Sequence, residues 1–174
     1  MRTFIAVEVP EELKKYFVGL QKRLEEDAKI AFSKDFHLTL KFLGEIHEDK
    51  VEKVKNVLKE VEFEGFKLKT SEIGVFPNED YVRVVWVGLE PGDKIKELQR
   101  LVDDKLKDFP NDHKFHPHIT LGRVKFIPDK NKFKETLKSL KIQEKEFEVK
   151  DFRLKKSILT PEGPVYEDLK IYEF

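Results

Sequence analysis

The sequence contains no cysteine, and it carries no excess charge of either sign. Its 174 residues include 34 Lys and Arg and 34 Asp and Glu, which gives a formal net charge of +0 at pH 7. Without cysteine there is neither a disulfide framework nor thiol chemistry, which suits a reducing compartment, so we expect a cytoplasmic protein. Without net charge no long-range field attracts nucleic acid, so an RNA or phosphate partner must be held locally.

Long apolar runs and the common nucleotide-binding motifs are also missing. No stretch approaches the ~20 apolar residues of a membrane-spanning helix, and the apolar run within residues 1–10 is too short for a signal peptide, so we expect no membrane contact. The chain has no Walker-type or G-x-G-x-x-G loop, no G-x-S-x-G and no H-E-x-x-H. These absences give no support to ATP-driven, Ser/Cys-nucleophile or cofactor-dependent chemistry, and we expect no cofactor.

What the sequence does contain is one tetrapeptide pattern twice. H-x-T-L occurs at His37–Leu40 and at His118–Leu121, a separation of 118 − 37 = 81 residues. Both copies lie in apolar, β-favouring surroundings, and side chains at i and i+2 of a strand share a face. Each copy therefore presents one imidazole beside one hydroxyl.

The duplication extends beyond the tetrapeptide. Apolar stripes at helical spacing run from Leu13 to Leu24, from Val51 to Val61, from Ile95 to Leu106 and, more weakly, from Phe133 to Leu140. We expect a strand before the first helix of each half and a strand at each H-x-T-L copy. Three further strands are expected at 66–76, 147–159 and 165–174. The order is β-α-β-α-β, then β-α-β-α-β-β. We predict an α+β fold in which residues 1–174 form a single two-lobed domain, with half-repeats of 1–80 and 81–174 and the two motifs meeting in a cleft between the lobes.

The paired histidines and threonines suit chemistry on a phosphate ester. His37 and His118 could respectively give and take protons, or the reverse, because histidine titrates near neutrality. Thr39 and Thr120 could donate hydrogen bonds to non-bridging phosphoryl oxygens. The alternatives are half-buried strand histidines satisfied by backbone, and threonines that reflect β propensity. Duplication of the pair favours the functional interpretation.

Arg123 is a further candidate for binding phosphate or stacking on a base. It follows His118 by five residues, so in a regular strand it would point to the opposite face, although Gly122 allows a bend. The alternative is a surface arginine. The matching position of the first half, 123 − 81 = 42, is Phe42, so the site is not fully symmetric.

A zinc cluster is the competing interpretation of His113, His116 and His118. We do not favour it, because a proline intervenes, no cysteine is available and the acidic neighbours are limited to Asp108 and Asp112. We therefore expect no metal.

Other polar and aromatic features have simpler interpretations. His47 is expected on the surface and Trp86 in the core. The lysine-rich stretches 125–141 and 150–156 are interleaved with acids, which favours solvated faces over an RNA track.

Two H-x-T-x motifs in one short chain resemble the 2H phosphoesterase superfamily, and most closely the bacterial and archaeal RNA 2′,3′-cyclic phosphodiesterases, historically called 2′-5′ RNA ligases. Residues 2–7 look like that family's first strand, 36–44 and 117–123 like its two motifs, and 157–166 like its terminal hairpin. The likeness covers nearly the whole chain, with no departure at the catalytic positions.

The resemblance implies antiparallel sheets in two lobes and metal-independent hydrolysis of RNA 2′,3′-cyclic phosphate ends to 2′-phosphates. It implies His37 as acid, His118 as base, Thr39 and Thr120 on the phosphate, and Arg123 on the substrate. The reverse reaction would be 2′-5′ ligation. Substrates would be RNA 3′ ends, from tRNA-like or other cleaved RNA, and we expect a monomer. Two alternatives stay open: a phosphodiesterase of small cyclic nucleotides, and a non-catalytic RNA-end or nucleotide-binding module.

Overall fold

The computed structural model describes residues 1–111 and 113–174. Thirteen elements follow one another as β1 (Arg2–Glu8), α1 (Glu11–Leu24), β2 (Lys29–Phe32), β3 (His37–Glu45), α2 (Glu48–Leu58), β4 (Phe66–Asn78), β5 (Tyr81–Glu90), α3 (Gly92–Lys105), β6 (His118–Phe126), α4 (Lys130–Ser139), β7 (Glu146–Val149), β8 (Asp151–Thr160) and β9 (Gly163–Glu173). The four expected helices are confirmed. None of the described helices is long and apolar enough to cross a lipid bilayer.

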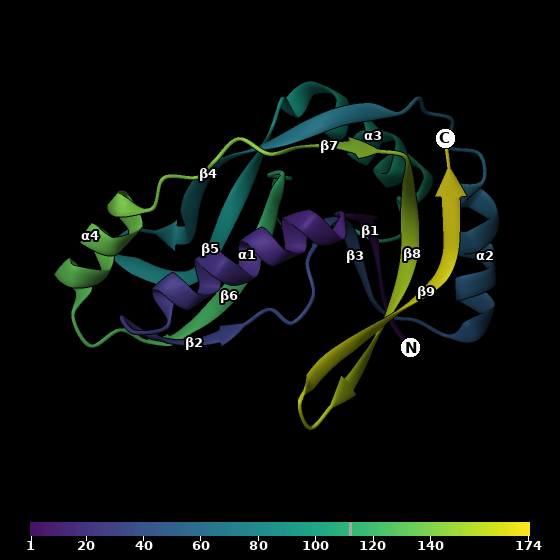
Figure 1. The fold of residues 1–174 in the computed structure, drawn as a ribbon. Coiled ribbons are helices and arrows are strands. Elements are labelled where there is room, and N and C mark those ends of the chain that lie inside the picture. The colour runs from purple at the N-terminus through teal and green to yellow at the C-terminus, as the bar shows by residue number, and fades with distance from the viewer. Residues whose placement is uncertain (112) are drawn as a thin grey trace.

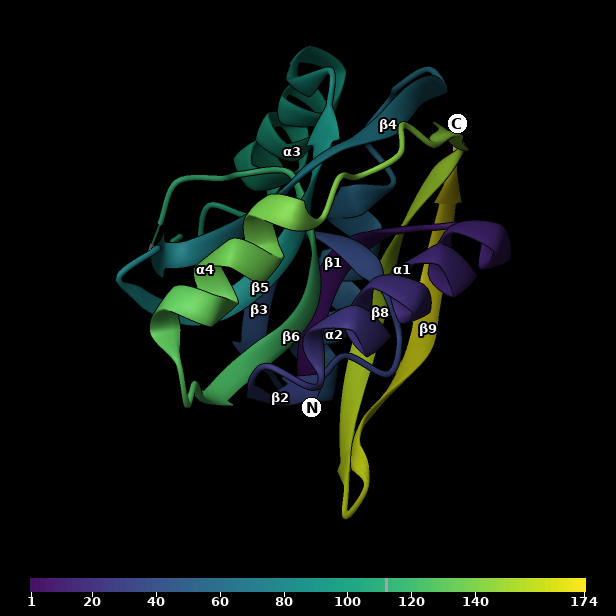
Figure 2. The same ribbon diagram turned by 60° about the vertical axis from the view of Figure 1, so that its left-hand side comes forward.

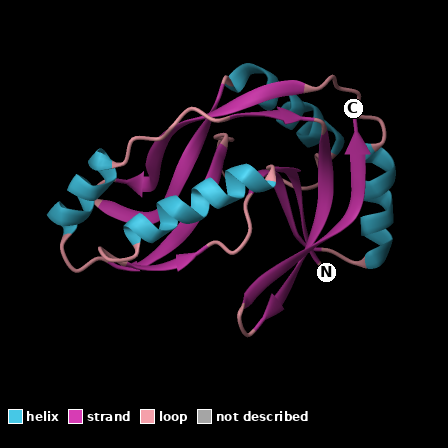
Figure 3. Cartoon of the chain, viewed as in Figure 1, coloured by secondary structure: helices cyan, strands magenta, loops and turns pink. Residues whose placement is uncertain are grey.

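The strands form two antiparallel sheets, which confirms the predicted α+β class (Figures 1 and 3). Sheet A has the order β3-β1-β8-β9, and sheet B has the order β2-β6-β5-β4-β7. In Figure 1, α2 flanks sheet A on one side of the molecule and α4 lies at the opposite end beside β4. The β8–β9 hairpin extends beyond the rest of the chain in both ribbon views (Figures 1 and 2).

The two sequence halves exchange their last strands. Sheet A combines β1 and β3 with β8 and β9 from the second half, whereas sheet B combines β5, β6 and β7 with β2 and β4 from the first. The long helices follow the same exchange, since α1 contacts β6 and α3 contacts β3. Each sheet therefore depends on both halves of the chain, and the sequence duplication does not map one half to one sheet.

Two details of the predicted strand order were wrong. The run expected as one strand over 147–159 is two strands, β7 and β8, which belong to different sheets and are separated by Lys150. The short strand β2, which pairs with the edge of β6, was not expected. The apolar alternation shifts by one residue at this point, from Phe147 and Val149 to Phe152 and Leu154, and this shift marks the passage between the sheets.

Buried apolar side chains from both sheets and all four helices form one continuous cluster. Its fully buried members include Phe17 on α1, Leu58 on α2, Ile95 on α3 and Phe133 on α4. Trp86 is buried, as predicted, with 7% of its surface exposed, but it lies outside this cluster, on the face of sheet B that carries Thr120. The helices thus cover the outer faces of the sheets and leave the faces that carry the histidines for the site.

Candidate functional site

The two H-x-T-L segments occupy equivalent places in the two sheets. His37 is the first residue of β3 and His118 is the first residue of β6, and the two strands share one burial pattern along all nine residues. The strands are in contact with one another, so the fold brings the two motifs to the junction of the sheets. In each strand the histidine and threonine are half-buried on one face, while the residue between them is fully buried.

A β-bulge at the same place in each strand sets the face of the residues that follow. Thr39 pairs with Ala6 and Lys41 with Ile5, which leaves Leu40 without a partner position. In β6 the bulge falls on Leu121, the residue that corresponds to Leu40. An extra residue shifts the alternation of side chains by one from that point on.

The bulge resolves on which face Arg123 lies. Arg123 pairs with Val84, and Thr120 pairs with Trp86 two residues further along β5. Because directly opposed residues of adjacent strands share a face, Arg123 lies on the same face as Thr120. In a regular strand Arg123, five residues after His118, would lie on the opposite face from His118. By the same geometry Phe42 shares the face of His37, where it is 57% exposed.

Glutamine side chains from the crossing helices satisfy the carbonyl groups at both bulges. Gln21 on α1 donates through Nε2 to the carbonyl oxygens of Leu121 and Ser33, each at 2.9 Å. Gln99 on α3 donates to the carbonyl oxygen of Leu40 at 3.4 Å. A bulge disrupts the ladder locally, so these donors stabilise the backbone shape that orients the site.

Around His37 the site is aromatic and charged. The imidazole lies 4.9 Å from the Phe4 ring and 5.0 Å from the Tyr166 ring of β9, which meets it edge-on. Glu8 is opposite His37 in the ladder and forms an ion pair with the buried Lys155. Lys155 also binds Asp168 at 2.7 Å.

Burial is the largest cause of a lowered pKa at His37, and the Lys155 ammonium lowers it further, to about 4. The nearby carboxylates of Glu8 and Asp35 oppose this shift without cancelling it. The Nδ1 atom of His37 is buried and has no hydrogen-bond partner among the described residues. The ring is therefore neutral near pH 7 in the free protein.

His118 lies in a different setting. Its ring contacts Phe76 at 5.1 Å, Trp86 at 5.9 Å and His116 at 6.1 Å. Nδ1 of His118 is 2.5 Å from the carbonyl oxygen of His116. A carbonyl oxygen can only accept, so Nδ1 carries the proton and Nε2 presents its lone pair when the ring is neutral.

The pKa of His118 is also lowered, chiefly by burial, while its bond to the His116 carbonyl acts in the opposite sense. Arg123 contributes to the lowering, and its charge also acts on Tyr166, the ring that packs on His37. Arg123 is thus within electrostatic reach of groups from both sheets. The five residues predicted for the site accordingly lie on two contacting strands.

The sequence did not indicate several residues of this region: Glu8, Lys155, Asp168, Phe76 and Tyr166. Tyr166 lies in the terminal hairpin that resembles the family's, and this resemblance was the one feature of the sequence that could have indicated it. The others come from strands whose pairing across the sheets is not visible in the pattern of the chain.

The zinc interpretation draws no support from the described residues, in which no group of three or more His, Asp or Glu side chains is placed to hold a metal ion. His113 is described and has interactions of its own, whereas Asp112 lies outside the described residues. His47 is exposed before α2, as predicted.

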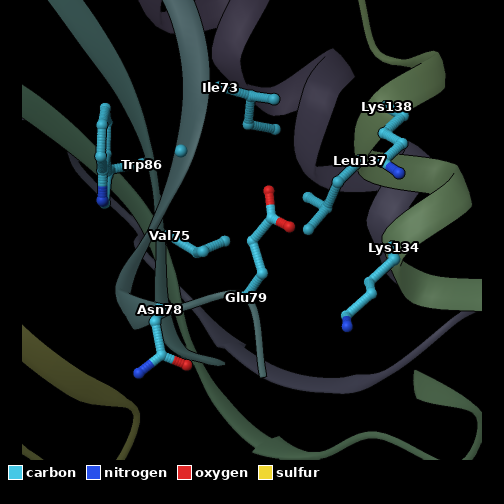
Figure 4. Close-up of a pocket in the computed structure, with 9 residues that line it drawn as sticks. Ile73, Val75, Asn78, Glu79, Trp86, Lys134, Leu137 and Lys138 are labelled. Carbon is cyan, nitrogen blue, oxygen red and sulfur yellow. The ribbon is translucent and has the colours of Figure 1, made fainter. Parts of the chain in front are cut away.

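Two hollows flank the turn between β4 and β5. One, of about 470 Å³, lies between β4 and α4 and is lined by Ile73, Val75 and Leu137 with Lys134 and Lys138 at its side (Figure 4). The other, of about 490 Å³, is lined by the ends of β5 and β6 and the start of α4, and it includes Arg123. The cleft expected between the lobes stays a prediction.

The comparisons with known proteins agree with the duplication. The family described as LigT like Phosphoesterase matches residues 7–86 and, a second time, residues 87–166. A protein of Methanocaldococcus jannaschii named RNA 2′,3′-cyclic phosphodiesterase is 37% identical over 174 residues, covering 98% of this chain and 99% of the relative. One of Archaeoglobus fulgidus with the same name is 38% identical, covering 99% of this chain and 100% of the relative.

Solved structures match the fold over nearly the whole chain. The crystal structure of TT0787 of Thermus thermophilus superposes with a TM-score of 0.80 at 28% identity and covers 99% of this chain and 97% of that one. Escherichia coli LigT, crystallised with 3′-AMP, superposes with a TM-score of 0.76 at 23% identity, covering 99% of this chain and 96% of that one.

Proposed function

The chain belongs to the LigT-like phosphoesterase family, and on that basis we propose that it hydrolyses 2′,3′-cyclic phosphate ends of RNA to 2′-phosphate ends. The observation that carries the proposal is the pair of H-x-T strands, equally bulged and in contact, which presents two imidazoles and two hydroxyls at the junction of the sheets. Relatives at 37% and 38% identity are named for this reaction.

In this proposal His118 is the general base. Its Nδ1 proton is held by the His116 carbonyl, so Nε2 is the atom that accepts a proton from water. The water oxygen then forms a bond to phosphorus. The lowered pKa of His118 keeps the ring neutral and able to accept near pH 7.

His37 is the general acid. As the bond between phosphorus and the 3′ oxygen breaks, the imidazolium gives its proton to that oxygen, which leaves a 3′-hydroxyl and a 2′-phosphate. The pKa of His37 in the free protein is about 4, so protonation must be favoured by the bound phosphate anion. Thr39 and Thr120 donate to the non-bridging oxygens, and Arg123 binds the phosphate or the base that follows it.

Because both sheets supply essential groups, the whole two-lobed chain is the working unit of this proposal. Run in reverse, the same site joins a 2′-phosphate end to a second RNA, but water at its normal concentration favours hydrolysis. The alternative substrates are small cyclic nucleotides, which present the same five-membered phosphate ring.

The test is incubation with an RNA oligonucleotide that ends in a 2′,3′-cyclic phosphate, in the presence of a chelator. We expect a 2′-phosphate product, no effect of the chelator, and losses of at least ~10²-fold in His37→Ala and His118→Ala. His47→Ala is the matched control, since this histidine is exposed and lies outside both motifs, just before α2. A 3′-phosphate product or a large chelator effect would contradict the proposal.

A further inference from the structure

The groove at the end of sheet B gathers positive charge from three elements. Its lining includes five cationic side chains: Arg83 of β5, Arg123 and Lys125 of β6, and Lys130 and Lys134 of α4. Of the described residues, two carboxylates line it, which leaves an excess of 5 − 2 = +3 in a chain whose formal net charge is +0. The fold has concentrated here lysines that are interleaved with acids along the sequence.

One of the two carboxylates is paired with a lysine of the groove, and the other is directed out of it. Asp80 forms an ion pair with Lys134 at 3.0 Å, and a hydrogen bond from that lysine is the largest cause of the lowered pKa of Asp80. Figure 4 shows the Glu79 carboxylate directed into the neighbouring hollow between β4 and α4. Among the described residues, none of the other four cations of the groove forms an ion pair, although the charge of Lys130 also acts on Asp80, so they are available to an anionic ligand.

The groove also carries two large exposed rings. Tyr81 is 56% exposed and Phe126 is 63% exposed, whereas most aromatic side chains of the protein are buried or half-buried. Arg83 is held against Tyr81, with its guanidinium carbon 5.6 Å from the ring centre and a hydrogen bond of 2.7 Å to the hydroxyl. Cations alternating with exposed rings are the pattern by which proteins hold single-stranded nucleic acid, through phosphate contacts and base stacking.

Arg123 connects this groove to the candidate site. It lines the groove, and it lies on the same face of β6 as Thr120, beyond the bulge. Its charge also acts on His118. A chain whose terminal phosphate is bound between the two threonines can therefore continue past Arg123 into the groove.

We propose that this groove binds the RNA segment on the 5′ side of the cyclic phosphate, with Arg83, Lys125 and Lys130 on successive phosphodiesters and Tyr81 and Phe126 against the bases. The inference rests on the proposed function and narrows the substrate class to oligonucleotide ends. A mononucleotide cyclic phosphate occupies only the catalytic part of this path.

The experiment compares kcat/KM for a nucleoside 2′,3′-cyclic phosphate with that for an oligonucleotide ending in the same group, over a range of salt concentrations. We expect the oligonucleotide to be preferred at least tenfold at low salt. A plot of log kcat/KM against log salt concentration should fall more steeply for the oligonucleotide than for the mononucleotide. The difference in slope should be about 0.7 for each phosphate that the groove contacts.

The variant Lys125→Glu/Lys130→Glu should remove most of that preference and lower the oligonucleotide's salt slope by about 1.4, while leaving mononucleotide turnover unchanged. Its matched control is Lys53→Glu/Lys94→Glu. This control makes the same change in net charge at exposed lysines of α2 and α3, and we expect it to keep the preference.

The outcomes separate the two proposals. No turnover of either substrate would contradict the proposed function. Turnover of the mononucleotide without a preference for the oligonucleotide would overturn the groove alone. The groove proposal would also be overturned if the preference for the oligonucleotide survived in Lys125→Glu/Lys130→Glu, or if it fell equally in Lys53→Glu/Lys94→Glu.

Discussion

Replacing His37 with glutamine should make the free energy of unfolding less sensitive to acid. The pKa of His37 is about 4 in the folded protein, against an ordinary value of 6.5. Between these values the unfolded chain binds more protons than the folded one, so stability rises with pH through this window and is lost as pH falls from 6.5 towards 4. At 1.36 kcal/mol per unit, lowering the pH from 7 to 5 costs about 2 kcal/mol through this group.

The assay is urea unfolding of wild type and His37→Gln at pH 7 and pH 5. Carboxylates titrate alike in both proteins, so the difference between the two losses isolates His37. We expect wild type to lose about 2 kcal/mol more than the variant. His47→Gln serves as control and should lose as much as wild type, because His47 is exposed.

The same reasoning can be checked directly by NMR titration of the histidine rings. We expect the His37 resonance to titrate with a midpoint near 4 in the free protein, and at higher pH in Lys155→Gln, because the Lys155 ammonium is the second-largest cause of the shift. A midpoint at or above 6.5, or equal stability losses in wild type and His37→Gln, would refute the reasoning.

Three further outcomes follow from the geometry. The pH profile of kcat/KM should be bell-shaped, with its optimum below pH 6.5 and a fall of about tenfold per pH unit on the alkaline side. The reason is that His37 must be protonated and His118 neutral for the reaction. An optimum above pH 7 would contradict the assignment of His37 as acid and His118 as base. Gln21→Leu removes the hydrogen bonds from Gln21 to the Leu121 and Ser33 carbonyls, of which Leu121 keeps its bond from the Ser33 N–H, and should lower the free energy of unfolding by about 1–2 kcal/mol, measured in urea. In Gly122→Ala the new methyl would lie 2.5 Å from a side chain of β2 and 3.0 Å from its backbone, so we expect a loss of about 1–3 kcal/mol; an unchanged urea midpoint would argue against this packing.

The sequence located the repeated H-x-T-L motif and the helices better than it predicted how the chain arranges them. His37 and His118 are visible because the same short pattern recurs with the same i, i+2 spacing, and the helices are visible because their apolar stripes are regular. Both depend only on local periodicity, which survives whatever the tertiary pairing is.

The face on which Arg123 lies and the position of the proton on His118 depend on contacts that lie outside the motif pattern. The bulge at Leu121 has no mark of its own in the sequence beyond the neighbouring glycine, yet it moves Arg123 to the face of Thr120. The proton on Nδ1 of His118 is fixed by the His116 carbonyl, a backbone group that no motif records. The exchange of β4 and β8 between sheets is equally hidden, since each strand satisfies the same alternation in either sheet.

The groove brings together charges that the order of residues along the chain does not place together. Along the chain, the acids within 125–141 suggested a solvated face. In space, Lys125, Lys130 and Lys134 line one groove with Arg83 and Arg123, and only two carboxylates join them. Charge patterning along a sequence therefore does not predict which charges a turn and a helix start will bring together.

The central claim is that His37 gives a proton to the leaving oxygen while His118 takes one from water. A substrate whose 3′ bridging oxygen is replaced by sulfur tests it, because a thiolate leaves without protonation and so does not need a general acid. We predict that His37→Ala loses at least ~10²-fold on the oxygen substrate but little on the sulfur substrate, whereas His118→Ala loses as much on both. Equal losses of both variants on both substrates, or recovery of His118→Ala in place of His37→Ala, would contradict the account.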